Sequence, residues 1–172
     1  MKTAARRTRL NSNKEASKDP MKLVVSEIMT RKVKTAGPET SLEMAIDVMV
    51  NKEIGHLPIV DRDGVLMGIV SKSDLIRERF LDGDTHELDH TAAVSFLDEL
   101  LSHGFHEEVE VQRSVADIMS KKVRTVRENA TVAEAAVTMS KFRVHGLPVV
   151  SQDNVLVGFV STFDIVAWVA SN

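Results

Sequence analysis

Two short apolar runs separated by a polar turn form the clearest pattern in the chain. The runs are Leu57–Val60 and Val65–Val70, and the turn between them is Asp61–Gly64. Apolar runs of this length, joined by a short turn whose last residue tolerates positive φ, predict a β-hairpin. Pro58 has no backbone N–H, so we expect it at the start or the edge of a strand.

The hairpin pattern occurs a second time, at Leu147–Val150 and Val155–Val160. The whole segment that starts at Val115 aligns with the segment that starts at Val25, without a gap. Two copies are too few for a solenoid. The repeat therefore predicts two like units related by a pseudo-two-fold axis.

Each copy also predicts a short helix, a short strand and a longer helix before the hairpin, and a last helix after it. In the first copy Ser26 opens the short helix, and Val33–Thr35 forms the strand. Thr40 with Glu43 starts the longer helix, because a hydroxyl followed three residues later by a carboxylate is a helix-start signal. The last helix starts near Asp74. The corresponding positions of the second copy are Ser114, Val123–Thr125, Thr131, Glu134 and Asp164.

The chain before the first copy is polar and basic. Residues 1–20 include the run Arg6-Arg7-Thr8-Arg9 and almost no apolar side chain, which predicts a disordered tail. The chain thus divides into a tail (1–20), a first motif (21–80), a linker (81–111) and a second motif (112–172).

The linker has two features of its own. An apolar stripe predicts one extra helix over Thr91–Leu101. His86 and His90 have the spacing of metal ligands on one helix face. Their polar setting favours a solvated linker instead, so we expect no metal site.

Composition narrows the function classes. Hydrophobic residues make up 43% of the 172 positions, and no apolar run is long enough to insert into a membrane. The absence of cysteine excludes disulfides and thiol catalysis and suits the cytoplasm. A net charge of -3 and the absence of tyrosine argue against nucleic-acid binding.

A serine and an aspartate mark the start of the last helix in each copy. Ser71 is followed by Asp74, and Ser161 by Asp164. The unpaired N–H groups of a helix start attract anions, so the serine could bind a phosphate while the aspartate accepts the two hydroxyls of a ribose. The other interpretation is a capping box, in which each pair only closes the first turn of its helix.

These repeated motifs resemble a tandem CBS-domain pair, the Bateman module. The resemblance rests on a short helix ending in Ile-Met, a Thr after the first strand, Leu-Pro-hydrophobic-Val, and Gly-x-Val-Ser-x-x-Asp, each present twice. It implies an α/β (α+β) fold with two pseudo-symmetric motifs, each a small three-stranded sheet with helices, packed sheet to sheet. It also implies clefts that bind AMP, ADP, ATP or S-adenosylmethionine, with no cofactor required.

The resemblance assigns ligand-binding roles residue by residue. The aspartates would bind ribose hydroxyls, the serines would lie by the phosphates, and one threonine per copy would touch the nucleoside. The segments before and into the hairpin would line the adenine slots, where His56 and His145 occupy neighbouring but not equivalent positions. The expected residues are Thr35, Ile54, Gly55, His56, Leu57, Pro58, Ser71, Lys72, Asp74, Thr125, Val144, His145, Gly146, Leu147, Pro148, Ser161 and Asp164.

We therefore expect a non-enzymatic regulatory module that signals to a protein partner, because no catalytic set of side chains stands out. The apolar last helix, Asp164–Ala170, predicts a homodimer. Lys72, where the second copy has Thr162, predicts that the first site favours the more phosphorylated ligand. The alternative is a nucleic-acid-associated regulator that uses the basic N-terminal arm.

Overall fold

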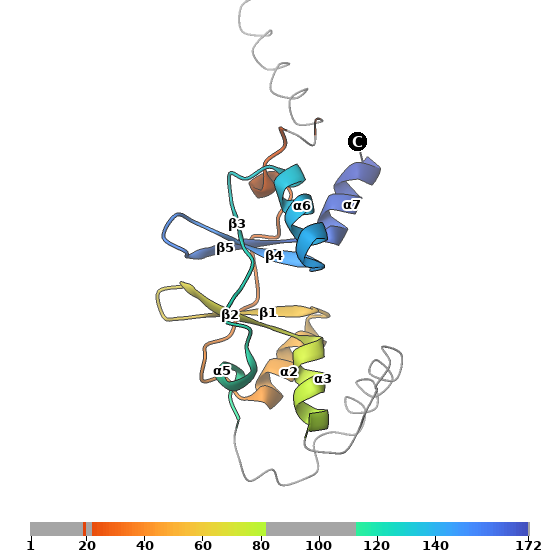
Figure 1. The fold of residues 1–172 in the computed structure, drawn as a ribbon. Helices are drawn as coiled ribbons and strands as arrows, with labels where there is room; N and C mark the ends of the chain where they lie inside the picture. Colours follow the sequence, from red (N-terminus) through yellow and green to blue (C-terminus); the bar gives the residue numbers. More distant parts are fainter. Residues whose placement is uncertain (1–18, 20–21, 82–112, 172) are drawn as a thin grey trace, which may run out of the picture. The chain divides into compact units, whose positions relative to one another are not determined.

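The computed structural model describes Asp19, residues 22–81 and residues 113–171. Most of the predicted tail, and the linker with its predicted helix and histidines, lie outside these residues. The described residues form two compact units, one from those up to residue 33 and from residue 124 onward, and the other from those between 34 and 123. We call them unit 1 and unit 2. In each unit helices cover one face of a small sheet, so the fold is mixed α/β (Figure 1).

Unit 2 is built on the first predicted hairpin. Strands β1 and β2 pair antiparallel, and Gly64 in the turn has a positive φ of 79°, as the turn chemistry predicts. A single parallel bridge from Ala36 to Ile59 takes the place of a third strand. The elements are α2 (Leu42–Asn51), β1 (His56–Val60), β2 (Leu66–Ser71), α3 (Lys72–Leu81) and α5 (Val115–Ile118).

Unit 1 repeats this arrangement with one more strand. Its sheet has the order β3-β4-β5, in which β3 is parallel to β4 and β4 is antiparallel to β5. Asn154, the counterpart of Gly64, has a φ of 62°. The elements are the 3-10 helix η2 (Val25–Glu27), β3 (Val126–Arg127), α6 (Val132–Phe142), β4 (Gly146–Val150), β5 (Leu156–Ser161) and α7 (Thr162–Ser171).

The short helices are exchanged between the two copies. Val25, from the first copy, is fully buried in the core of unit 1, and Thr30 bridges Phe159 there. Val115, from the second copy, is fully buried in the core of unit 2, and Ser120 bridges Ile69. Each compact unit therefore combines the hairpin of one copy with the short helix of the other.

The predicted first strands are placed too early. The expected Val33–Thr35 and Val123–Thr125 are replaced by the bridge at Ala36 and by β3. Ala36 N–H donates to the Pro58 carbonyl at 3.1 Å, and Ala36 accepts from Val60 N–H at 2.9 Å. Pairing therefore starts only where the chain runs beside the second half of the hairpin strand.

The helix starts follow the predicted signals in part. Thr131 and Glu134 form the expected reciprocal cap of α6. Helix α2 is capped by Ser41 and not by Thr40, because the Ser41 hydroxyl accepts from the Met44 N–H at 3.3 Å. Ser114 precedes α5 as predicted, whereas η2 begins one residue before Ser26.

The two prolines lie inside their strands, not at the start. Pro58 opposes Ile69, whose backbone N–H and C=O both bond to Ser120 and thus point away from the proline. Pro148 opposes Phe159, whose backbone groups bond to Thr30 in the same way. At such non-hydrogen-bonded positions the hairpin needs no proline donor. The prediction missed that each hairpin offers this position in its interior.

No helix in the described part of the chain is long and apolar enough to cross a membrane.

Candidate functional site

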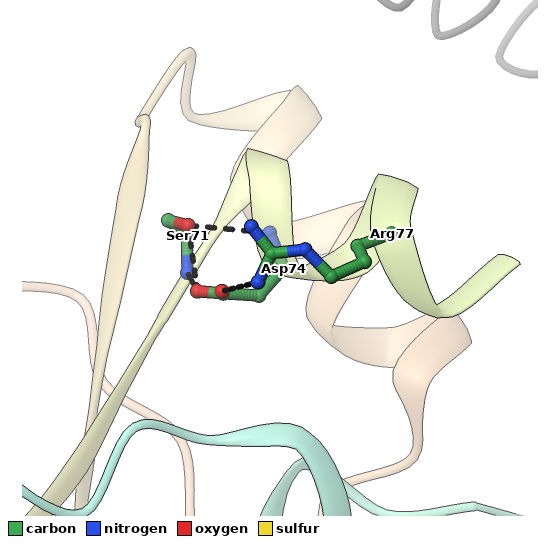
Figure 2. A network of polar contacts seen from close by, with 3 residues as sticks. All are labelled: Ser71, Asp74 and Arg77. Carbon is green, nitrogen blue, oxygen red and sulfur yellow. Dashed lines mark hydrogen bonds and ion pairs between the residues drawn. The ribbon is translucent and has the colours of Figure 1, made fainter. Parts of the chain in front are cut away.

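Ser71 and Asp74 form a closed pair where β2 passes into α3 (Figure 2). The Asp74 Oδ2 atom accepts the Ser71 backbone N–H at 2.8 Å and the Ser71 hydroxyl at 2.6 Å. Ser71 Oγ in turn accepts the Asp74 backbone N–H at 3.3 Å. This is a reciprocal capping box that fixes the first turn of α3 to the end of the hairpin.

Ser161 and Asp164 form the same pair where β5 passes into α7. Asp164 Oδ2 accepts the Ser161 N–H at 2.7 Å and the Ser161 hydroxyl at 2.6 Å. Ser161 Oγ accepts the Asp164 N–H at 3.2 Å. Both copies therefore hold a half-buried carboxylate in one orientation.

The capping boxes decide which atoms remain for a ligand. Each carboxylate oxygen has two lone pairs, and Oδ2 already accepts two hydrogen bonds. Oδ1 is therefore the oxygen at which ligand hydroxyls can bind. A serine hydroxyl has one proton, which here goes to the carboxylate. The expected contact of Ser71 and Ser161 with phosphates would require this hydrogen bond to break.

The helix starts also use backbone donors internally. Lys72 N–H donates to the Gly55 carbonyl at 3.2 Å, and Thr162 N–H donates to the His145 carbonyl at 2.9 Å. The backbone N–H of Asp74, in the first turn of α3, donates to the Ser71 hydroxyl. Fewer N–H groups are left for an anion than a bare helix start would offer.

The expected site residues of the first copy separate into two groups. Gly55, His56, Ser71, Lys72 and Asp74 meet at one end of the hairpin, since His56 pairs with Ser71. Thr35 lies toward the other end, in the wall of a hollow of about 930 Å³ whose other residues include Gly37, Val60, Asp61 and Arg62.

The expected slot residues on β1 and β4 alternate between the two faces of each sheet. Leu57 and Leu147 are fully buried in the cores under the helices. Their side chains therefore stabilise the fold and do not line a slot. Alternate strand residues point to opposite faces, so Pro58 and Pro148 point away from these cores. Ile54 and Val144 pack on the edges of the same cores, partly buried.

The two copies differ at Gly146. A Cβ atom at Gly146 would meet the Phe159 ring, whose Cζ atom lies 2.8 Å from that position. The first copy has His56 and Ile69 at the corresponding places. The sequence patterns did not indicate that Phe159 and Gly146 contact each other.

The second-copy residues Val144, His145 and Thr162 line a pocket of about 460 Å³ between α6 and α7. Met139 and Arg143 complete much of its wall. Thr125, half-buried beside β3, does not take part.

Arg77 is a charged group that the motif analysis overlooked. Its Nη1 atom lies 3.7 Å from Asp74 Oδ1, the oxygen left free by Ser71 (Figure 2). The spacing of three residues on one helix, with opposite charges, was the available signal. No cluster of three or more His, Cys, Asp or Glu able to hold a metal occurs among the residues that the structure describes.

Comparison with known proteins gives the repeated motifs a family. Residues 25–80 and 115–171 each match the CBS domain. An inosine-5'-monophosphate dehydrogenase of Thermoplasma acidophilum is 31% identical over 158 residues, which are 91% of this chain and 26% of that protein. The chain spans only about a quarter of the length of the first curated relatives it matches.

Solved structures share the fold. The CBS domain pair of a protein crystallised with 5'-methylthioadenosine and S-adenosyl-L-methionine has a TM-score of 0.62 and 26% identity, over 86% of this chain and 96% of that one. CBSX2 of Arabidopsis thaliana, in complex with AMP, has a TM-score of 0.66 and 25% identity over the same shares. Both copies carry the family's motif on the family's fold; the chain belongs to the CBS domain family, and its copies form a tandem CBS pair.

Proposed function

We propose that this chain is a ligand-sensing regulatory module that binds an adenosine-containing molecule and signals its presence to a protein partner. The candidate ligands are AMP, ADP, ATP and S-adenosylmethionine. The candidate ligand-binding residues are those assigned by the family motif, with Asp74 and Asp164 as the ribose-binding groups and with Leu57 and Leu147 contributing only their backbone, since their side chains are buried in the cores.

The oriented carboxylates are the observation that carries this proposal. Each aspartate is fixed by its serine through Oδ2, which leaves the two lone pairs of Oδ1 for a cis-diol. A carboxylate that is already oriented loses little conformational entropy when a ligand binds. Relatives with the same fold were crystallised with AMP, 5'-methylthioadenosine and S-adenosyl-L-methionine, all of which contain a ribose.

Isothermal titration of AMP and S-adenosylmethionine into Asp74→Asn and Asp164→Asn tests the assignment. Asparagine can still accept the serine N–H, but it lacks the charge that strengthens hydrogen bonds to ligand hydroxyls. The loss should be about 1.5–3 kcal/mol at the altered site, or roughly 10-fold to 100-fold in Kd.

Asp117→Asn is the matched control. Asp117 Oδ2 accepts the Ser114 N–H at 2.8 Å and the Ser114 hydroxyl at 3.0 Å, so it forms the same kind of capping box outside the candidate site. Its loss should affect folding stability without affecting ligand affinity. Unchanged affinity in both site variants, or equal loss in the control, would refute the site.

Regulation without catalysis fits a chain whose matched residues are CBS domains only. Several relatives are enzymes of which the matching region is about a quarter, so any activity attached to this module belongs to the partner or to a larger assembly. Ligand binding can shift a partner only through different affinities for two states of the module. The alternative that the basic arm binds nucleic acid concerns Arg6, Arg7 and Arg9, which lie outside the described residues.

We further propose that the module is a homodimer in which a second copy covers α7. Helix α7 has no buried residue, and Val166 and Val169 on it are 63% and 61% exposed. Val166 also lines the pocket between α6 and α7, which offers a second copy a concave apolar surface beside a convex one. A C₂ interface needs this kind of self-complementary patch.

A further inference from the structure

The two copies differ in the charge that faces the free carboxylate oxygen. In the first copy Arg77 Nη1 lies 3.7 Å from Asp74 Oδ1 (Figure 2). The residue at the corresponding position of the second copy is Ala167. Asp164 thus keeps the serine contacts of Asp74 and lacks its arginine.

The arginine approaches the one oxygen that ligand hydroxyls can use. Ser71 saturates Oδ2, so a ribose at Asp74 must share Oδ1 with Arg77 or displace it. At 3.7 Å the two groups form an ion pair, but the distance is too long for a hydrogen bond. The Arg77 side chain is 69% exposed, so the guanidinium is free to turn away from Asp74.

What the displaced guanidinium meets depends on the ligand. A neutral nucleoside binds Asp74 Oδ1 through its hydroxyls and has no anionic group with which the guanidinium could pair. A nucleoside phosphate offers oxygens that a guanidinium binds well, often with two parallel hydrogen bonds. Lys72, on the first turn of the same helix, adds a second cation, where the second copy has Thr162.

We infer that Arg77 is a specificity-determining residue, which makes the Asp74 site select phosphorylated adenosine ligands over neutral ones, while the Asp164 site lacks this selection. The inference rests on the proposed function, since it assumes that both aspartates bind ribose. It adds a role for a residue of the first copy that the second copy does not share. Arg77 repels no ligand; it competes with a neutral ligand and assists an anionic one.

The test compares adenosine with AMP at each site separately. The Asp164→Asn background isolates the Asp74 site, and the Asp74→Asn background isolates the Asp164 site. In the first background Arg77→Ala should strengthen adenosine binding and weaken AMP binding, which lowers the preference for AMP by about tenfold or more. In the second background Ala167→Arg should raise the preference for AMP.

Arg62→Ala is the control for net charge, because Arg62 is exposed on the hairpin turn and lies outside the Ser71–Asp74 pair. It should leave the ratio of the two affinities unchanged. Circular dichroism melting checks that each variant is folded, and a change in stability alone would not alter a ratio of affinities.

The outcomes separate the inference from the proposal on which it rests. If neither AMP nor adenosine binds the unaltered protein, this inference fails, and the proposed function fails with it only if ADP, ATP and S-adenosylmethionine do not bind either. If both bind but Arg77→Ala leaves the AMP to adenosine ratio as it was, Arg77 has no part in specificity and the proposed function stands. An equal change in Arg62→Ala would assign the effect to overall charge and also overturn the inference.

Discussion

The Met29 side chain packs directly on the backbone of Gly158, although the two residues come from different copies of the repeat. A Cβ atom at Gly158 would lie 3.0 Å from Met29 Cγ and closer still to the sulfur. Met119 packs on Gly68 in the same way, with 2.9 Å to its Cγ atom. These contacts join each exchanged short helix to the sheet of its unit.

We predict that Gly158→Ala and Gly68→Ala each destabilise the fold by about 1–2 kcal/mol, because the added methyl group crowds the methionine that packs on each glycine. Urea denaturation monitored by circular dichroism measures the change. Gly37→Ala is the matched control, since a Cβ atom there meets nothing within 4 Å.

A double-mutant cycle tests whether the methionine is responsible. In a Met29→Ala background Gly158→Ala should cost much less than in the unaltered chain, with a coupling energy of about 1 kcal/mol. Additive effects would show that the methyl group clashes with something other than Met29.

The local elements were predictable from sequence because their causes are local. The hairpin turns at Gly64 and Asn154 and the cap at Thr131 depend on residues a few positions apart. The exchange of the short helices was not predictable, because both copies carry the same Met and Gly. Neighbouring residues alone cannot decide whether Met29 packs on Gly68 or Gly158.

The candidate site was predictable to a similar depth. The Ser-x-x-Asp spacing located both carboxylates, and its two interpretations converge, since the capping box itself orients Asp74 and Asp164. The side chain of Leu57 was misassigned because a motif does not say which face of a strand is covered by helices. Arg77 was missed because the second copy has Ala167 at the corresponding position, so the repeat shows no shared pattern there.

Phe159 and Gly146 predict a second pair of coupled substitutions. Gly146→Ala should destabilise unit 1 by about 1–3 kcal/mol, because its Cβ atom would overlap the Phe159 ring. Phe159→Ile in the same chain should recover part of that loss, since the first copy has the smaller Ile69 at the position of Phe159 and a residue with a side chain, His56, at the position of Gly146. Thermal melting of the single and double variants measures both effects. If the double variant loses more stability than the two single variants lose together, the proposed packing is wrong.

Glu134 predicts a pH dependence of stability. The Thr131 backbone N–H, which donates to Glu134 Oε2 at 2.7 Å, is the main cause that lowers the pKa of Glu134, and the Thr131 hydroxyl adds to it. A pKa that is lower in the folded state stabilises the fold above the unfolded pKa, and this stabilisation is lost as the pH falls through the folded pKa.

Glu134→Gln should therefore be less stable than the unaltered chain at neutral pH, and the difference should shrink in acid. Urea denaturation at several pH values from acidic to neutral measures this difference in the free energy of unfolding. Glu128→Gln serves as the control, as an exposed carboxylate in the same unit that forms no helix cap. A difference between Glu134→Gln and the unaltered chain that is constant with pH would rule out the cap as its source.

The last prediction concerns the exposed face of α7. If a second copy covers this helix, Val166→Asp and Val169→Asp each place a charge in an apolar interface. An uncompensated buried charge costs about 3 kcal/mol or more, so the dimer dissociation constant should rise roughly 100-fold. Sedimentation velocity over a range of concentrations gives that constant.

Met67→Asp is the control, because Met67 is a 41% exposed apolar residue on β2 and not on α7. A chain that sediments as a monomer at micromolar concentration before any substitution would disprove the homodimer outright. A dimer that survives both valine substitutions would place its interface on another surface and leave the apolar face of α7 to a different partner.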